Sequence, residues 1–129
     1  MKVSDDIERL ITRPAVMVDG QTTIRRAAAL LTDESIGVLV IQGTHPPALV
    51  SERDVVTALA DGMDPDLEHV EIIATMDVAV AGPHDSIGAV GRLMVDNEVR
   101  HVPIVDGHAV AGVVSMRDVL TAALGLAPE

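Results

Sequence analysis

The chain of 129 residues contains no Phe, Trp or Tyr, and it contains no Cys. Without aromatic rings it cannot stack nucleic-acid bases on ring platforms, build an RNA-recognition sheet or line a methyl-ammonium cage. The absence of Cys excludes disulfides, thiolate nucleophiles and cysteine-ligated zinc or iron–sulfur sites. Apolar residues still make up 48% of the chain. Val, Ile, Leu, Ala and Met must therefore fill the core of what its length predicts to be one compact domain.

Basic residues are also scarce, with nine Lys and Arg against twenty Asp and Glu and a net charge of -11. Phosphate backbones and anionic lipids would repel such a chain, so we expect no nucleic-acid and no membrane partner. No apolar run approaches the eighteen or so residues needed to cross a bilayer. The first residues, Met1 to Asp6, lack the basic and apolar regions of a secretory signal. These features predict a cytoplasmic protein.

An internal repeat organises the sequence. Ser51–Ala58 and Ser115–Ala122 are identical at six of eight positions, at an offset of 64. The apolar run Val38–Ile41 falls on Val102–Val105 at the same offset, whereas Thr23-Ile24 matches Ser86-Ile87 at an offset of 63. This difference predicts that one residue has been gained or lost between the helix and the strand. Similar segments in the same order indicate two copies of one structural unit.

Each half is expected to form a β-α-β-β-α unit, and the fold class is therefore α/β, with two tandem units packed as an intramolecular pair. Thr23 and Ser86 have hydroxyls suited to capping a helix, and apolar residues follow each of them at helical spacing. The expected strands are 15–18, 38–41 and 48–50 in the first half, and 78–81, 102–105 and 110–114 in the second; the last helix of each half begins at Ser51 or Ser115.

Turn-forming and acidic residues at 62–66 mark the connection between the halves. The predicted organisation is a helical N-terminal segment (1–12), a first repeat (13–62), a linker (63–75) that contains a turn or two of helix, a second repeat (76–126) and a tail (127–129). Neither half has enough apolar surface to stand alone, so the two are expected to pack together.

The repeated unit resembles the cystathionine-β-synthase (CBS) domain, and two copies in tandem are similar to a CBS pair, or Bateman module. The segments that carry the resemblance are Arg100–Gly107 and Gly112–Asp118. The resemblance implies a regulatory sensor and not an enzyme. In the family, adenine nucleotides such as AMP, ADP or ATP, and in some members other adenosyl compounds, bind in clefts between the two repeats.

The resemblance implies roles for particular residues. Asp54 and Asp118 would accept hydrogen bonds from ribose hydroxyls, while Ser51 and Ser115 would contact phosphate. A carboxylate accepts two neighbouring hydroxyl donors well, and the first turn of a helix offers N–H groups and a positive dipole to phosphate. The resemblance further implies that Arg100 and His101 add positive charge near the phosphate. Backbone groups around Met76 to Val78 and Arg13 to Ala15 would form hydrogen bonds with the edge of the adenine. Gly37, Pro103 and Arg117 would also contact the ligand.

The first half departs from the family pattern. By the alignment above, Gly37 stands where the second half has His101, and Ala48 stands where it has Gly112. The connection before Ala48 contains Pro46-Pro47. The first repeat thus supplies fewer phosphate ligands, and we expect one occupied site and not two. Which pocket Arg100 and His101 serve, and which nucleotide binds, stay open.

A simpler interpretation is that each Ser-x-Arg-Asp segment only caps a helix. The chain would then be a ligand-free dimerisation or scaffold module. Under either interpretation the expected assembly is a homodimer, and a separately encoded effector protein would carry any output of the sensor.

Catalysis and metal binding are not expected. The five histidines (His45, His69, His84, His101 and His108) lack the close spacing of metal ligands, and no nucleophile elbow accompanies them. Glycine-rich phosphate loops are absent as well, so kinase and NTPase chemistry is excluded.

Overall fold

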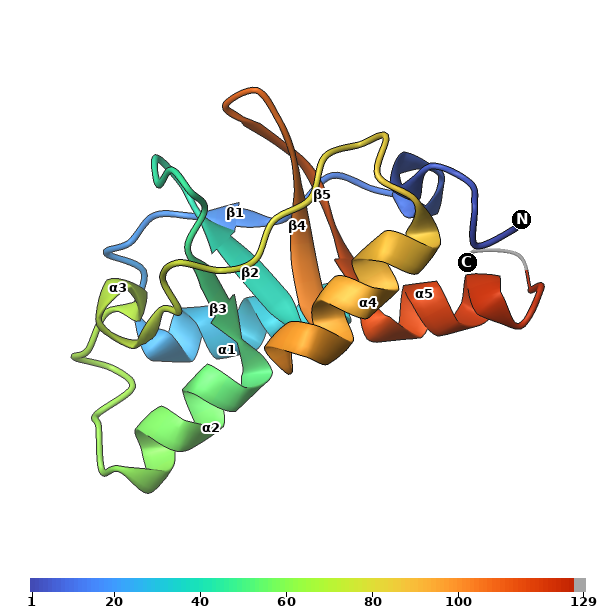
Figure 1. Ribbon diagram of the computed structural model, residues 1–129. Helices are drawn as coiled ribbons and strands as arrows, with labels where there is room; N and C mark the ends of the chain where they lie inside the picture. The colour runs from blue at the N-terminus through green and yellow to red at the C-terminus, as the bar shows by residue number, and fades with distance from the viewer. Residues whose placement is uncertain (127–129) are drawn as a thin grey trace. The chain divides into compact units, whose positions relative to one another are not determined.

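A computed structural model describes residues 1–126, so the predicted tail at 127–129 lies outside the described residues. The chain forms two compact units, each of mixed α/β structure, which confirms the predicted fold class. The first unit is Val16–Val78, and the second unit consists of Met1–Ala15 with the chain from Ala79 onward. Figure 1 shows the helices and strands with the labels used below.

The first unit has a three-stranded sheet in the order β1-β2-β3, in which β2 runs parallel to β1 and antiparallel to β3. Its elements are β1 (Met17–Val18), α1 (Ile24–Asp33), β2 (Val38–Ile41), β3 (Leu49–Ser51), α2 (Glu52–Ala60) and α3 (Val70–Ile73). Aliphatic side chains form its core, among them Ile24, Leu31, Leu39, Val50, Val55 and Val70.

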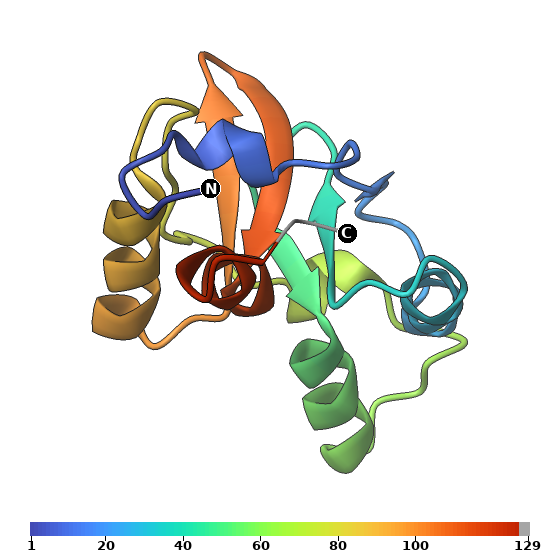
Figure 2. The same ribbon diagram turned by 90° about the vertical axis from the view of Figure 1, so that its right-hand side faces the viewer.

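The second unit is built on an antiparallel hairpin of β4 and β5. Its elements are the 3-10 helix η1 (Ile7–Leu10), α4 (Ile87–Asn97), β4 (His101–Asp106), β5 (Ala109–Ser115) and α5 (Met116–Ala123). η1 packs against α5 and lies next to the hairpin (Figure 2). The core contains Ile7, Leu10, Ile87, Val90, Met94, Val102, Ile104 and Val114.

The predicted helix starts are confirmed. The Thr23 hydroxyl accepts from the Arg26 N–H at the start of α1, and the Ser86 hydroxyl accepts from the Ala89 N–H at the start of α4. Each cap satisfies a backbone N–H that has no partner within the helix. The apolar residues that follow face the core, as their helical spacing predicts.

The two repeats exchange their leading segments. Residues 5–12 correspond to residues 68–75 at an offset of 63, but 5–12 pack in the unit that holds the second repeat, while 68–75 pack in the unit that holds the first. Equivalent backbone hydrogen bonds fix both segments. The Ile7 N–H donates to the Asp85 carbonyl (2.7 Å), as the Val70 N–H donates to the Thr22 carbonyl (2.8 Å). The Ile87 N–H donates to the Asp5 carbonyl (2.9 Å), as the Ile24 N–H donates to the Glu68 carbonyl (3.0 Å). Each compact unit therefore combines residues from two sequence repeats.

The prediction of a strand at 78–81 is wrong for most of these residues. Only Ala81 pairs with β4, in one parallel bridge to Ile104. In the first unit the Val40 N–H donates to the Val16 carbonyl (3.0 Å) and extends the β1–β2 ladder by a second pair. In the second unit the position equivalent to Val40 is occupied by Pro103, which has no backbone N–H to donate. This proline explains why the second sheet has two strands where the first has three.

The position of the extra residue in the second repeat also needs correction. Val18 pairs with Ile41 and Ala81 pairs with Ile104, so the offset is still 63 at the second strand. It becomes 64 only after the register shift between Ile104 and Val105. The additional residue is thus absorbed as an irregularity in the β4–β5 hairpin and not between helix and strand. As a consequence, Gly37 corresponds to Arg100, and not to His101 as the sequence alignment predicted.

The difference between Ala48 and Gly112 has a packing cause. A Cβ added at Gly112 would lie 2.8 Å from Cγ2 of Ile11. The residue equivalent to Ile11 in the other leading segment is Ala74, which packs on the core that contains Ala48. In the second unit a large residue packs beside the glycine, whereas in the first unit both equivalent positions hold alanine.

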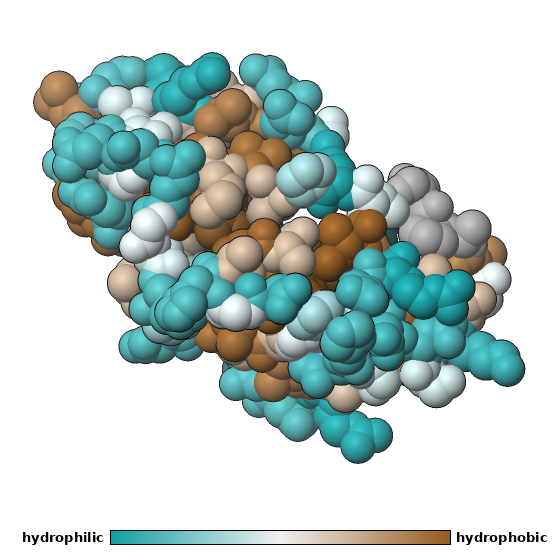
Figure 3. Space-filling view, turned by 90° about the horizontal axis from the view of Figure 1, so that it is seen from above, coloured by the Kyte–Doolittle hydropathy of each residue, from teal (hydrophilic) through white to brown (hydrophobic). Residues whose placement is uncertain are grey.

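No helix among residues 1–126 is long and apolar enough to cross a bilayer. The face shown in Figure 3 is covered largely by hydrophilic residues, with hydrophobic residues exposed among them. Acidic residues contribute most of the charge, in keeping with the net charge of -11.

Candidate functional site

The twelve candidate ligand-binding residues are divided between the two units. The first unit contains Gly37, Ser51, Asp54, Met76 and Val78, and the second contains Ala15, Arg100, His101, Pro103, Ser115, Arg117 and Asp118. Each set is described within its own unit.

In the first unit, Ser51 and Asp54 form a capping box at the start of α2. The Asp54 N–H donates to Ser51 Oγ (3.1 Å), and the Ser51 N–H donates to Asp54 Oδ2 (2.8 Å). The hydroxyl of Thr75 lies 3.4 Å from Asp54 Oδ1. The carboxylate is half-buried and held in place by the backbone of α2.

In the second unit, Ser115 and Asp118 repeat this arrangement at the start of α5. The Asp118 N–H donates to Ser115 Oγ (3.1 Å), while the Ser115 N–H and hydroxyl both donate to Asp118 Oδ2 (2.7 and 2.9 Å). No described residue donates a hydrogen bond to Asp118 Oδ1. Both segments thus cap their helices, and this role leaves one oxygen of Asp118 able to accept further donors.

This geometry has a definite chemical capacity. A fixed carboxylate with an unused oxygen accepts hydrogen bonds from hydroxyl groups, and a pair of neighbouring hydroxyls suits it best. The N–H groups in the first turn of α2 or α5 carry partial positive charge, which favours an anion nearby. Each Ser-x-Arg-Asp segment can therefore offer an acceptor for hydroxyls beside a donor surface for phosphate.

The start of the strand β4 lies next to the start of α5, because the Met116 N–H donates to the Arg100 carbonyl (2.8 Å) and His101 pairs with Ser115. Arg100 and Arg117 are exposed and His101 is half-buried. The second unit thus brings two guanidinium groups and an imidazole to the elements that carry Ser115.

The first unit lacks these side chains. The Glu52 N–H donates to the Gly37 carbonyl (3.0 Å), so Gly37 occupies the place of Arg100, and Val38 occupies the place of His101. Only Arg53 remains as an equivalent of Arg117. The first unit thus has fewer basic side chains at these positions than the second, while their role as phosphate ligands stays a prediction.

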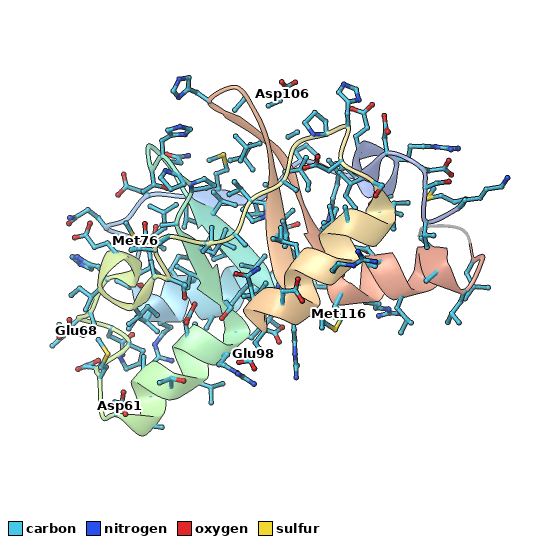
Figure 4. All side chains as sticks on the ribbon, in the orientation of Figure 1. Asp61, Glu68, Met76, Glu98, Asp106 and Met116 are labelled. Atoms are coloured by element: carbon cyan, nitrogen blue, oxygen red, sulfur yellow. The ribbon has the colours of Figure 1, made fainter. Side chains whose placement is uncertain are left out.

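The remaining candidates lie on less regular backbone. Met76 follows α3 and exposes 59% of its surface (Figure 4), while Val78 and Ala15 are half-buried at the ends of their units. Pro103 is buried in β4, and its carbonyl accepts the Ala81 N–H (3.2 Å). The structure brings none of these four into contact with the two capping boxes through a hydrogen bond between described residues.

Sequence reasoning missed Thr75, the hydroxyl residue next to Asp54. A signal for it was present, because Thr12 and Thr75 match at the offset of 63 that also relates Thr23 to Ser86. The contact depends on the pairing of Leu49 with Thr75, which ties the segment after α3 to β3. Such a long-range pairing is not visible in local spacing.

Comparison with known proteins confirms the resemblance. The sequence profile described as CBS domain matches the chain twice, over residues 3–61 and 70–125. An uncharacterized 33.4 kDa protein encoded in a ribosomal RNA operon of Thermofilum pendens is 30% identical over 105 residues. That match covers 78% of this chain and 34% of the relative, so the chain spans about a third of the relative's length.

Two solved structures extend the comparison. The hexameric CBS-CP12 protein from bloom-forming cyanobacteria superposes with a TM-score of 0.84 at 25% identity, over 92% of this chain and 70% of that one. The CBS domain protein PAE2072 from Pyrobaculum aerophilum, solved in complex with AMP, gives a TM-score of 0.78 at 28% identity, over 93% of this chain and 98% of that one. With both repeats matched by the family profile and the fold shared with these proteins, the chain belongs to the CBS domain family and carries two CBS domains in tandem.

Proposed function

We propose that this CBS pair binds an adenine nucleotide of the AMP, ADP or ATP type and regulates a separate effector protein according to whether that ligand is bound. The observation that carries the proposal is the pair of carboxylates, Asp54 and Asp118, fixed at the starts of α2 and α5. Asp118 keeps Oδ1 available to ribose hydroxyls while its other oxygen closes the capping box. Ser51 and Ser115 stand beside helix N–H groups that favour phosphate.

Two further observations support this proposal. PAE2072, which shares the fold at 28% identity, was solved with AMP. Arg100, His101 and Arg117 belong to the backbone segments next to Ser115, and we propose that their side chains offset the charge of a phosphate there. Because the second unit has more of these groups than the first, one nucleotide per chain is expected to bind more tightly than any second one.

Regulation requires that the ligand bind two states of the protein with different affinity. We propose that the chain acts as a homodimer, since α2 and α5 each expose large apolar side chains. Val56 and Leu59 on α2 expose 64% and 50% of their surface, and Leu120 on α5 exposes 56%. Pairing of these helices with a second copy of the chain would remove these side chains from water. No catalytic role is proposed.

Isothermal titration calorimetry with AMP, ADP, ATP and S-adenosylmethionine tests the proposal. Asp118→Asn keeps an oxygen that can accept from the Ser115 N–H, but it removes the charge that ribose hydroxyls would meet. We expect this variant to bind the preferred ligand with at least about tenfold lower affinity, because a hydrogen bond to a charged group is worth about 1.5–3 kcal/mol.

Ser86→Ala is the matched control. It removes a helix cap in the same unit and should lower stability by about 1 kcal/mol without changing affinity. If none of the four ligands gives heat or raises the melting temperature, the proposal is wrong and the alternative, a ligand-free dimerisation or scaffold module, takes its place. If a ligand binds but Asp54→Asn and Asp118→Asn both keep full affinity, the assignment of the carboxylates is wrong.

A further inference from the structure

Two carboxylates and an imidazole gather where the N-terminal segment meets the loop before α4. Asp6 and Glu8 belong to the segment around η1, and His84 lies 76 residues after Glu8 in the sequence. His84 Nδ1 is 3.0 Å from Asp6 Oδ2 and 3.9 Å from Glu8 Oε1. One atom from each side chain lies within 4.8 Å of the other two, and among the described residues this is the group of Asp, Glu and His that could hold a metal ion.

The backbone holds these side chains together. The Ile7 N–H donates to the Asp85 carbonyl (2.7 Å), and the Glu8 N–H donates to the Pro83 carbonyl (3.2 Å). These two bonds join the residues on either side of His84 to the residues that follow Asp6. The backbone positions that carry the three side chains are thus fixed by hydrogen bonds, which lowers the cost of bringing them together around an ion. The side chains themselves are exposed (78% for His84, 45% for Asp6 and 49% for Glu8) and can turn toward it.

The first unit provides an internal comparison. At the offset of 63, His84 corresponds to Gln21 and Glu8 corresponds to Glu71. There the Gln21 amide donates to Glu71 Oε1 (3.2 Å). The same fold therefore accepts a glutamine at this place, with a hydrogen bond to the equivalent glutamate. An amide serves this structural purpose, whereas the imidazole in the second unit adds a nitrogen that can bind a metal.

We propose that Asp6, Glu8 and His84 form a binding site for a divalent transition-metal ion, with Zn²⁺ as the best-fitting one. Imidazole nitrogen with carboxylate oxygen is a ligand set that Zn²⁺ accepts, and it commonly uses three protein ligands and water. Ligand atoms around a tetrahedral Zn²⁺ lie about 3.4 Å apart, given bonds of about 2.0–2.1 Å. The distances of 3.0 and 3.9 Å from His84 to the two carboxylates lie on either side of this value, and the Asp6 and Glu8 ligand atoms lie within 4.8 Å of each other.

The local charge favours a cation as well. The carboxylates of Asp6, Glu8 and Asp106 surround His84 with negative charge. Asp106 is at the end of β4, near the tip of the hairpin (Figure 4). The bound ion would join η1 to the loop before α4 and so fasten the N-terminal segment to the second repeat. This role is independent of nucleotide binding.

Calorimetric titration of the metal-free chain of 129 residues with ZnCl₂, at a pH above the raised pKa of His84, tests the proposal. We expect one site per chain. His84→Gln reproduces the arrangement found in the first unit, so it should fold normally by circular dichroism and lose at least about tenfold in affinity. Asp6→Asn should weaken binding too, and it removes no helix cap because the Asp6 side chain makes no capping bond.

His69→Gln is the matched control, because His69 occupies the place of Asp6 in the first unit and its side chain makes no capping bond. It should leave Zn²⁺ affinity unchanged. A second readout is hydrogen exchange of the Ile7 amide, which Zn²⁺ should slow in the wild type and not in His84→Gln. Absence of saturable binding, equal affinity in wild type and His84→Gln, or a loss caused by His69→Gln instead would overturn the proposal.

Discussion

The side chain of Ile11 fills the space beside Gly112, so that a Cβ at residue 112 would lie 2.8 Å from Ile11 Cγ2. The N-terminal segment and β5 are therefore fitted to each other across about a hundred residues of sequence. The equivalent positions of the first unit hold Ala48 and Ala74, which belong to or pack against the same core. The two arrangements predict how mutations at these positions combine.

Gly112→Ala alone should lower the free energy of unfolding by about 1–2 kcal/mol, because the new methyl group collides with Ile11. Ile11→Ala alone should also cost about 1–2 kcal/mol through lost packing. The double variant recreates the small pair of the first unit and should cost less than the sum by at least about 0.5 kcal/mol. Urea unfolding followed by circular dichroism measures all three; strict additivity would show that the two residues do not share this space.

Pro103→Val should extend the second sheet. It supplies an N–H that can donate to the Ala79 carbonyl, as Val40 donates to Val16 in the first unit (3.0 Å). We expect the new amide to be protected from hydrogen exchange to a degree similar to that of Val40, measured by NMR in the same sample. Exchange of the introduced amide at the rate of an unstructured peptide would contradict our explanation of the missing strand.

Acid should remove the contribution of one ion pair in the first unit. Arg25 hydrogen-bonds Asp66 through Nε, and through Nη2 at 3.0 Å, which lowers the pKa of Asp66. A carboxyl whose pKa is lower in the folded state stabilises the fold above its unfolded pKa and loses this effect as the pH falls through its folded pKa.

Wild type should therefore exceed Asp66→Asn in stability at neutral pH by a small, salt-sensitive amount, since both partners are exposed. This difference in stability should shrink as the pH falls below about 4, the usual pKa of aspartate, and vanish in stronger acid. Urea unfolding at several pH values measures it, and a gap that persists in strong acid would argue against this ion pair as its source.

The absence of aromatic residues and Cys gives a direct assay for a bound nucleotide. The pure chain has almost no absorbance in the near ultraviolet, where adenine absorbs strongly. If the chain is purified with its ligand, we expect an adenine band that disappears after unfolding and dialysis. Chromatography of the released material identifies the nucleotide. A band that stays with the unfolded chain would come from a contaminant.

Much of the fold could be predicted from the sequence. The strand at Val38–Ile41 and the helix caps at Thr23, Ser86, Ser51 and Ser115 were found where expected, because local patterns determine them. The recurrence of Ser-x-Arg-Asp identified the repeat, and the family profile confirmed it. The boundaries drawn at 13–62 and 76–126 stay predictions about sequence repeats.

Features that depend on distant pairings could not be predicted. The exchange of the leading segments is invisible to a repeat search, which shows that 5–12 resembles 68–75 but not which unit each packs in. The prediction of a strand at 78–81 failed because its pairing depends on Pro103, which lies on β4 and has no N–H to donate. The cluster of Asp6, Glu8 and His84 was missed for the same reason, since its carboxylates come from the N-terminal segment.

The ribose hydroxyls test the central claim most directly. We would measure by calorimetry the affinity of AMP and of 2′-deoxy-AMP for the wild type, Asp54→Asn and Asp118→Asn. If a carboxylate at the start of α2 or α5 accepts the ribose hydroxyls, removing the 2′-hydroxyl should weaken binding to the wild type by about tenfold or more, and this penalty should vanish in one of the two variants. Equal affinity of the wild type for both nucleotides, or an equal penalty in all three proteins, would contradict the proposed site.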